Sequence, residues 1–121
     1  MRYMILIYGD PNATMDQTAA QSEAEMGRWF AYTEALRSSG ALVAGEALQD
    51  PGTATTVKAE NGTVLHTDGP FAETKEVLGG FYLIDVPTLD EALGWAGKIP
   101  SVDRGSVEVR PVVDFSEGAG A

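Results

Sequence analysis

The stretch Gly79-Gly80-Phe81-Tyr82-Leu83-Ile84-Asp85-Val86-Pro87 decides the fold of this chain. Residues 81–86 form a largely apolar, aromatic-rich run of the kind found in central strands, and Pro87 ends it. A short helix follows, because Thr88 and Glu91 have capping-box spacing and Pro100 supplies a stop. The apolar stripe of this helix comprises Leu89, Ala92, Leu93, Ala96 and Ile99. The stretch therefore predicts a strand followed by a helix.

The beginning of the chain has the same order of strand and helix. Residues 3–8 form a continuous apolar and aromatic run that Gly9-Asp10-Pro11 closes. A helix then ends at Gly40, and its start is open: Thr14 and Gln17 have capping-box spacing, but a later start fits the polar composition equally well. The predicted buried stripe of this helix comprises Met26, Trp29, Phe30, Thr33 and Leu36.

A hairpin is the sharpest local signal between these two halves. Asn61-Gly62 suits the two positive φ angles of a type I′ turn, and residues 53–59 and 63–68 flank it. Such a turn pairs Glu60 with Thr63, Ala59 with Val64, Val57 with His66 and Thr55 with Asp68. We therefore expect His66 and Asp68 to share a face of the hairpin.

The remaining segments complete an α+β pattern. Residues 41–48 are weakly strand-like, Asp50-Pro51-Gly52 is a turn, and residues 106–113 form a last strand with alternating valines. The order of strand, helix, strand, hairpin, strand, helix and strand predicts a ferredoxin-like (split βαβ) fold with an inserted β-hairpin. We expect a single domain over residues 1–115 and a flexible C-terminal tail over residues 116–121.

The predicted strands at residues 3–8 and 81–86 are apolar on both faces. Because two helices can cover only one face of such a sheet, the other face would form an exposed apolar patch larger than is usual for a monomer. A second copy of the chain is the expected cover for that patch. The sequence therefore predicts a homodimer.

Charge and composition argue against several classes of partner. The 121 residues include 18 acidic and 8 basic side chains, and the formal net charge of −10 repels a phosphate backbone. No window approaches the roughly 18 apolar residues of a membrane span, and the amino terminus has no signal-peptide pattern. The chain has no cysteine, which excludes disulfides and thiolate metal sites. We therefore expect a cytoplasmic protein with no nucleic-acid or membrane partner.

Three segments carry a family resemblance: Asp68-Gly69-Pro70-Phe71-Ala72-Glu73-Thr74-Lys75-Glu76, Gly79-Gly80-Phe81 and residues 105–112. The chain resembles the YCII-related proteins of the DGPF type over nearly its whole length. The resemblance implies a dimeric α/β barrel, in which two ferredoxin-like sheets face each other. It also implies a genetic setting beside extracytoplasmic-function sigma factors and a fold shared with small enzymes that work inside the barrel cavity.

The resemblance does not supply an active site for this chain. Shorter members of the wider YCII group have a proposed His-Asp pair, with the histidine in the helical first half. The single histidine of this chain, His66, lies on the predicted hairpin instead. The pair is therefore not carried over.

Asp68 and His66 are the candidate catalytic residues. A carboxylate at a strand end beside a buried sheet is a candidate acid or base, with His66 on the same face as its partner. An Asp before Gly-Pro is also ordinary turn chemistry, and this structural interpretation is favoured. A lone histidine argues against a transition-metal site, and no metal and no cofactor are indicated.

Arg110, Tyr82 and Glu108 are the candidate ligand-binding residues. Arg110 is a natural clamp for a carboxylate ligand if its face of the last strand lines a cavity. Otherwise it pairs with Glu108 or a neighbour, and alternation along the strand leaves both interpretations open. Tyr82 can place a hydroxyl in the same space, although an aromatic residue in a central strand more often belongs to the core.

Three functions stay open at this point. The first is a small-molecule-binding or accessory, regulatory dimer, with a sigma-factor-related protein as a candidate partner. The alternative is a cofactor-independent enzyme acting on a small organic substrate in the barrel cavity, with Asp68 as acid or base, His66 as its partner and Arg110 as anion clamp. The third is a dimer without a cavity of consequence.

Overall fold

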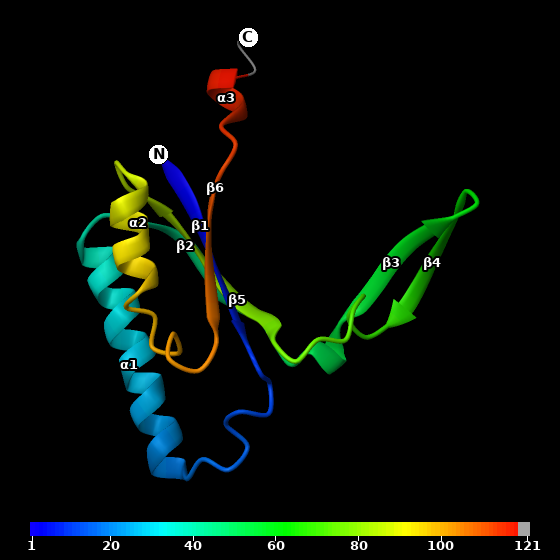
Figure 1. Ribbon diagram of the computed structural model, residues 1–121, viewed down its shortest axis with the longest axis horizontal. Helices are drawn as coiled ribbons and strands as arrows, with labels where there is room; N and C mark the ends of the chain where they lie inside the picture. The colour runs from blue at the N-terminus through cyan, green and yellow to red at the C-terminus, as the bar shows by residue number, and fades with distance from the viewer. Residues whose placement is uncertain (119–121) are drawn as a thin grey trace.

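The computed structural model describes residues 1–118 (Figure 1). The main sheet has four strands in the order β2-β5-β1-β6, and β3 with β4 forms a separate two-stranded sheet. The elements in chain order are β1 (Arg2–Gly9), α1 (Ala19–Ser38), β2 (Leu42–Ala47), the 3-10 turn η1 (Pro51–Thr53), β3 (Thr55–Glu60), β4 (Thr63–Asp68), β5 (Val77–Asp85), α2 (Leu89–Ala96), β6 (Ser106–Pro111) and α3 (Phe115–Gly118). This topology confirms the predicted ferredoxin-like α+β fold with an inserted hairpin.

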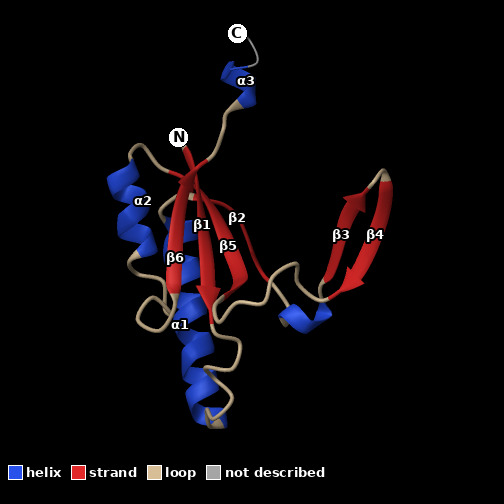
Figure 2. Ribbon diagram, turned by 45° about the vertical axis from the view of Figure 1, so that its right-hand side comes forward, coloured by secondary structure: helices blue, strands red, loops and turns tan. Residues whose placement is uncertain are grey.

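Both long helices cover the same face of the main sheet (Figure 2). Successive strand residues point to opposite faces, and the buried Tyr3 and Ile5 of β1 alternate with the partly exposed Met4 and Leu6. The buried residues pack with Ile84 of β5 and with helix residues Tyr32, Leu36, Ala92 and Ala96. Within residues 1–118 no helix covers the opposite face, which we call the open face.

α1 begins at a capping box built on Thr18. Thr18 Oγ1 accepts a hydrogen bond from the backbone N–H of Gln21 at 3.1 Å, and Gln21 Oε1 accepts one from the backbone N–H of Thr18 at 2.8 Å. These bonds satisfy two of the amide groups that a helix start leaves without partners. The later of the two predicted starts is therefore the correct one.

The buried face of α1 differs in part from the predicted stripe. Trp29 and Leu36 pack on the core as predicted, but Met26 and Phe30 are 58% and 69% exposed. The face toward the sheet repeats instead at Glu25, Trp29, Tyr32 and Leu36, with spacings of four, three and four residues. The prediction was wrong at Met26 and Phe30 because a hydropathy pattern assigns a charged residue such as Glu25 to solvent.

α2 follows its predicted cap closely. Thr88 Oγ1 accepts a hydrogen bond from the backbone N–H of Glu91 at 3.2 Å. Ala92, Ala96 and Ile99 are buried beneath the helix as predicted, whereas Leu89 and Leu93 are exposed.

None of the helices within residues 1–118 is long and apolar enough to cross a membrane.

Gly79 and Gly80 shape the start of β5. The register between β1 and β5 shifts between Ile7 and Tyr8, because Ile7 pairs with Gly80 while Tyr8 pairs with Leu78 and leaves Gly79 opposite the shift. A Cβ atom at Gly80 would lie 2.8 Å from the backbone oxygen of Glu46, so a larger residue would push β2 and β5 apart. The two glycines permit an irregular register and a close backbone approach.

β3 and β4 form the hairpin arm (residues 55–68), which projects from the main sheet (Figure 1). Asn61 and Gly62 have positive φ angles of 51° and 81°, and all four predicted pairs, including Val57 with His66 and Thr55 with Asp68, are present. At the base of the arm, the N–H of Gly69 donates to the backbone oxygen of Ala54 at 2.7 Å. The predicted hairpin and its register are confirmed.

The last strand ends earlier than predicted. β6 ends at Pro111 rather than at residue 113, and Ser116 belongs to the short helix α3. Residues 119–121 lie outside the described part of the chain. The flexible tail over residues 116–121 stays a prediction.

Tyr32 gives the fold a specific sensitivity to alkaline pH. Its hydroxyl donates to the backbone oxygen of Trp95 at 2.8 Å, and burial, followed by the neighbouring Tyr82, raises the pKa of Tyr32 well above its ordinary value. The folded state therefore holds the proton more tightly than the unfolded chain does. Stability is then fully present below the unfolded pKa of about 10 and falls above it, by up to about 1.4 kcal/mol per pH unit.

We expect Tyr32→Phe to show a shallower loss of unfolding free energy between pH 10 and 11 than the wild-type chain. At pH 7 the same variant should lose about 1 kcal/mol, because the hydrogen bond to Trp95 disappears. Urea unfolding at a series of pH values measures both effects. The other tyrosines are present in both proteins, so only Tyr32 can make their plots of unfolding free energy against pH differ in slope above pH 10. Parallel plots would therefore contradict the role of Tyr32.

Candidate functional site

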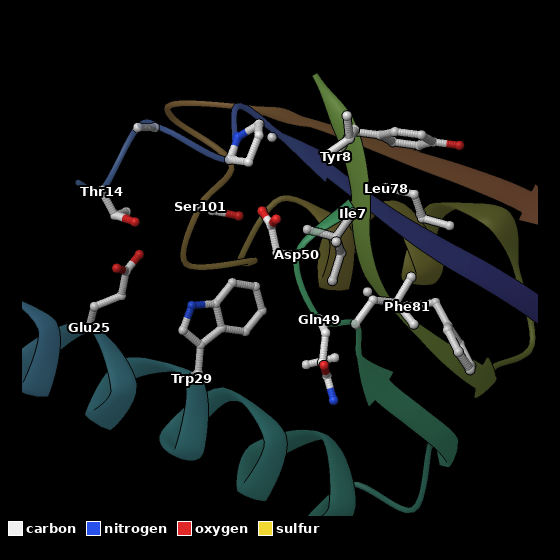
Figure 3. Close-up of a pocket in the computed structure, with 18 of the residues that line it drawn as sticks. Ile7, Tyr8, Thr14, Glu25, Trp29, Gln49, Asp50, Leu78, Phe81 and Ser101 are labelled. Atoms are coloured by element: carbon white, nitrogen blue, oxygen red, sulfur yellow. The ribbon is translucent and has the colours of Figure 1, made fainter. Parts of the chain in front are cut away.

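A cavity of about 810 Å³ lies between the amino-terminal half of α1 and the part of the main sheet where β1 ends and β5 begins (Figure 3). Its wall also includes the segment before α1, β2 with the turn that follows it, and the loop between α2 and β6. Small-molecule sites commonly have volumes of roughly 300–1,000 Å³ and a mainly apolar lining with a few polar groups. The cavity therefore has the size of a ligand site.

Aromatic side chains form the apolar wall of the cavity. Trp29 of α1 points toward the end of β1, where Ile7 lies (Figure 3). Tyr82 of β5 also lines the cavity, and its hydroxyl lies 2.6 Å from Thr33 Oγ1. Two aromatic residues on facing elements give a planar ring two surfaces to pack against.

Gly45 of β2 determines where the Tyr82 ring can lie. Gly45 and Tyr82 are paired in the register of β2 and β5, and a Cβ atom at Gly45 would lie 2.6 Å from Cδ1 of that ring. Any side chain at position 45 would therefore displace the ring. The absence of a side chain at Gly45 is part of the shape of the cavity.

The polar end of the cavity contains an ion pair whose carboxylate is buried and whose guanidinium is 34% exposed. Glu25 of α1 is 8% exposed, and its Oε1 pairs with Nη2 of Arg104 from the loop between α2 and β6. The other oxygen, Oε2, accepts a hydrogen bond from Gln17 Nε2 at 3.2 Å, and Gln17 Oε1 accepts one from Ser22 Oγ at 3.2 Å. The carboxylate is thus held by a cation on one side and an amide on the other. In Figure 3 it points away from α1 toward the segment that carries Thr14.

The five site residues predicted from the sequence lie in three regions of the structure: the cavity, the open face and the hairpin arm. Of the five, which are His66, Asp68, Tyr82, Glu108 and Arg110, Tyr82 alone lines the cavity. Glu108 and Arg110 lie on the open face, where Arg110 Nη2 donates to Glu108 Oε2 at 2.9 Å, and this hydrogen bond raises the pKa of the Arg110 guanidinium. The pairing of Glu108 with Arg110, which the sequence left as one of two interpretations, is confirmed.

His66 and Asp68 share a face of the hairpin arm, as the register predicted, and both are exposed. Neither residue lines the cavity. The loop after Asp68 is held by backbone and hydroxyl contacts: Gly69 N–H donates to the oxygen of Ala54, and Thr56 Oγ1 donates to the oxygen of Gly69 at 2.8 Å. The single chain does not bring Asp68 together with Arg110 or Tyr82.

Glu25 and Arg104 line the cavity but were not predicted as site residues from the sequence. Glu25 carried a usable signal, because its spacing to Trp29, Tyr32 and Leu36 places it on the same side of the helix as three apolar residues. A charged residue on a buried face implies a partner. Arg104 carried no such signal, since it lies in an irregular loop far along the chain from Glu25.

The fold and the cavity define the class of protein. It is an α+β protein with a ferredoxin-like sheet, both long helices on one face of that sheet and a cavity beneath α1. The chain belongs to the YCII-related domain family, whose family model matches residues 1–116.

Two known proteins resemble the chain over nearly its full length. An uncharacterized protein of Rhizobium meliloti (strain 1021) is 37% identical over 120 residues, which cover 98% of this chain and 97% of that protein. The structure of 5-chloro-2-hydroxyhydroquinone dehydrochlorinase (TftG) from Burkholderia phenoliruptrix AC1100, in complex with 2,5-dihydroxybenzoquinone, matches with a TM-score of 0.52 at 14% identity. That match covers 97% of this chain and 98% of the other. At this identity the second likeness shows the fold alone.

The Glu25–Arg104 pair predicts an asymmetric response to mutation. Arg104→Met leaves the buried Glu25 carboxylate without its cation, and we expect a loss of about 2–3 kcal/mol in the free energy of unfolding. The double variant Glu25→Leu with Arg104→Met removes both charges, so it should recover most of that loss. Urea unfolding of the wild type, the two single variants and the double variant measures the cycle.

The exposed pair of Glu34 with Arg37 on the same helix is the matched control, because both side chains are more than half exposed. Arg37→Met should cost less than about 0.5 kcal/mol. A loss in the double variant equal to the sum of the losses in the two single variants would show that the two charges are not coupled.

Proposed function

We propose that this protein binds a small organic molecule in the cavity beneath α1 and acts as a homodimer. The observation that carries the proposal is the cavity itself, in which the aromatic residues Trp29 and Tyr82 meet the Glu25–Arg104 ion pair. An apolar enclosure with a few fixed polar groups is the usual form of a small-molecule site. The complex of TftG with 2,5-dihydroxybenzoquinone supports the proposal, because a protein of the same fold holds a small ring compound.

The homodimer is supported by the open face of the main sheet. Met4 and Leu6 of β1 and Leu83 of β5 lie there partly exposed, with Glu108 and Arg110 beside them on β6. An apolar centre with both charge signs beside it can pair with a second copy of itself about a two-fold axis. A sheet-to-sheet dimer would cover this face and leave α1 and its cavity on the outside.

The sequence-based roles of the hairpin arm stay predictions. Within one chain the arm holds Asp68 and His66 away from the cavity, so catalysis by Asp68 would require a second subunit to complete the site. A regulatory role beside a sigma factor and a cytoplasmic location also stay predictions. Ligand binding in the cavity is common to the accessory and the enzymatic hypotheses, and it can be tested first.

A fragment screen by NMR tests the cavity directly. The chain has two tryptophans, so Trp95→Phe assigns the indole N–H signal of Trp29. We expect hits to shift the Trp29 signal, and we expect Gly45→Ala to weaken them about tenfold, because the added methyl group displaces the Tyr82 ring.

Leu93→Ala is the control for the screen, since Leu93 is exposed on α2 and does not line the cavity. It should leave the affinities unchanged. Hits that bind the wild type and Gly45→Ala equally, or that leave the Trp29 signal in place, would contradict the proposed site.

Light scattering tests the homodimer. The wild type should have twice the chain mass of 12.8 kDa at micromolar concentration, and Leu83→Glu should shift it to the monomer by placing a charge in the proposed interface. Phe30→Glu, which changes an exposed residue on the outer side of α1, should leave the dimer intact. A wild-type monomer, or a monomer produced equally by both variants, would contradict an interface on the open face.

A further inference from the structure

The polar end of the cavity is already charge-balanced before any ligand binds. Glu25 is buried and uses one oxygen for Arg104 and the other for Gln17. Arg104 also lines the cavity, so a ligand that reaches this end meets a carboxylate and a guanidinium that are bound to each other.

A charged head group on the ligand meets a like charge at this pair. A ligand carboxylate that binds Arg104 lies beside the Glu25 carboxylate, even when it uses guanidinium N–H groups that Glu25 leaves free. An ammonium group that binds Glu25 likewise lies beside the Arg104 guanidinium. In both cases two like charges lie close together at a partly buried position, which is unfavourable.

A hydroxyl group avoids this cost. It can donate its hydrogen to the Glu25 carboxylate and accept a hydrogen bond from an Arg104 N–H at the same time. Hydrogen bonds to ionised groups are shorter and stronger than those between neutral groups. A neutral head with one donor and one acceptor therefore matches the pair without separating it.

The other charged residues of the cavity wall affect anionic and cationic ligands differently. Asp10, Glu46 and Asp50 also line the cavity, so with Glu25 and Arg104 the wall carries four acidic groups and one basic group, a net charge of 1 − 4 = −3. Asp10 Oδ1 accepts from the N–H of Asn12 at 2.9 Å, and Asp50 Oδ2 accepts from the N–H of Gly52 at 3.2 Å. Anions are therefore disfavoured more strongly than cations.

We propose that the Glu25–Arg104 pair recognises a hydroxyl group on a neutral, ring-containing ligand, and that the cavity discriminates against carboxylates. This inference rests on the proposed ligand site and names its ligand class. The ring packs between Trp29 and Tyr82, and the hydroxyl reaches the ion pair at the polar end. A preference among matched ring compounds is the measurable consequence.

Four probes with the same naphthalene ring separate the possibilities: 2-naphthalenemethanol, its methyl ether, 2-naphthylmethylamine and 2-naphthoate. NMR titration of the Trp29 indole signal at pH 7 gives each affinity. For the wild type we expect the alcohol to bind most tightly, about tenfold better than the ether, which lacks the donor, and better still than the carboxylate. The amine should fall between the alcohol and the carboxylate.

Two variants test whether the ion pair sets this order. Glu25→Gln frees Arg104, so 2-naphthoate should gain affinity while the alcohol loses it, and the order of the two probes should reverse. Arg104→Gln, which keeps the carboxylate, should favour the amine over the alcohol. Glu34→Gln on the outer side of α1 is the matched control and should leave the order unchanged. Circular dichroism establishes that each variant is folded. If only one of Glu25→Gln and Arg104→Gln folds, that variant alone still tests whether the ion pair sets the order of probe affinities.

The outcomes separate this inference from the proposed function. If the probes shift the Trp29 signal but 2-naphthoate binds the wild type as tightly as the alcohol, the recognition role of the pair is wrong while the ligand site stands. The same holds if Glu25→Gln leaves the order unchanged. If none of the four probes shifts the Trp29 signal, the ligand site and its recognition element both fail.

Discussion

The packing of α1 and α2 against one face of the main sheet is the interaction on which the rest of the structure depends. Ile5, Leu36, Ile84 and Ile99 are almost completely buried in that layer, and each contributes roughly 1.5–3 kcal/mol through burial. These contacts lie toward the carboxyl-terminal half of α1. The amino-terminal half of the same helix carries Glu25 and Trp29 over the cavity. One helix thus anchors the core at one end and forms a wall of the cavity at the other.

The same packing leaves the second sheet face for another molecule. β1 and β5 place apolar residues on both faces, because side chains alternate along a strand and neither strand alternates with polar residues. Because α1 and α2 cover one face of the main sheet, the open face is the opposite face of the same sheet. The Glu108–Arg110 pair lies on that face, so it belongs with the proposed dimer contact rather than with the cavity.

Local sequence signals predicted most of the fold. The Asn61-Gly62 turn determined the register of the arm, and the Thr88 cap placed α2, because in each case the deciding contacts join residues a few positions apart. The face of α1 was predicted only in part. Glu25 is buried because of Arg104, and that contact joins segments separated by most of the chain, so no hydropathy period can report it. The residues around the cavity were harder still to predict. Tyr82, predicted as a ligand-binding residue, lines the cavity, whereas Arg104 lies in an irregular loop with no pattern to mark it.

The Glu25–Arg104 pair is informative because stability alone is a weak reason for a buried carboxylate. Two well-packed apolar residues in place of a buried ion pair often leave a protein equally stable or more stable. Glu25 and Arg104 instead lie at the wall of the cavity, with Gln17 and Ser22 continuing the polar contacts toward the segment before α1. Stability alone does not explain charged groups at this position, whereas the need to orient a polar group of a ligand does. Proteins commonly give up some stability where a site must be polar before its ligand arrives. The placement of the pair therefore argues that the cavity was shaped for recognition, and that it is more than a gap left by imperfect packing.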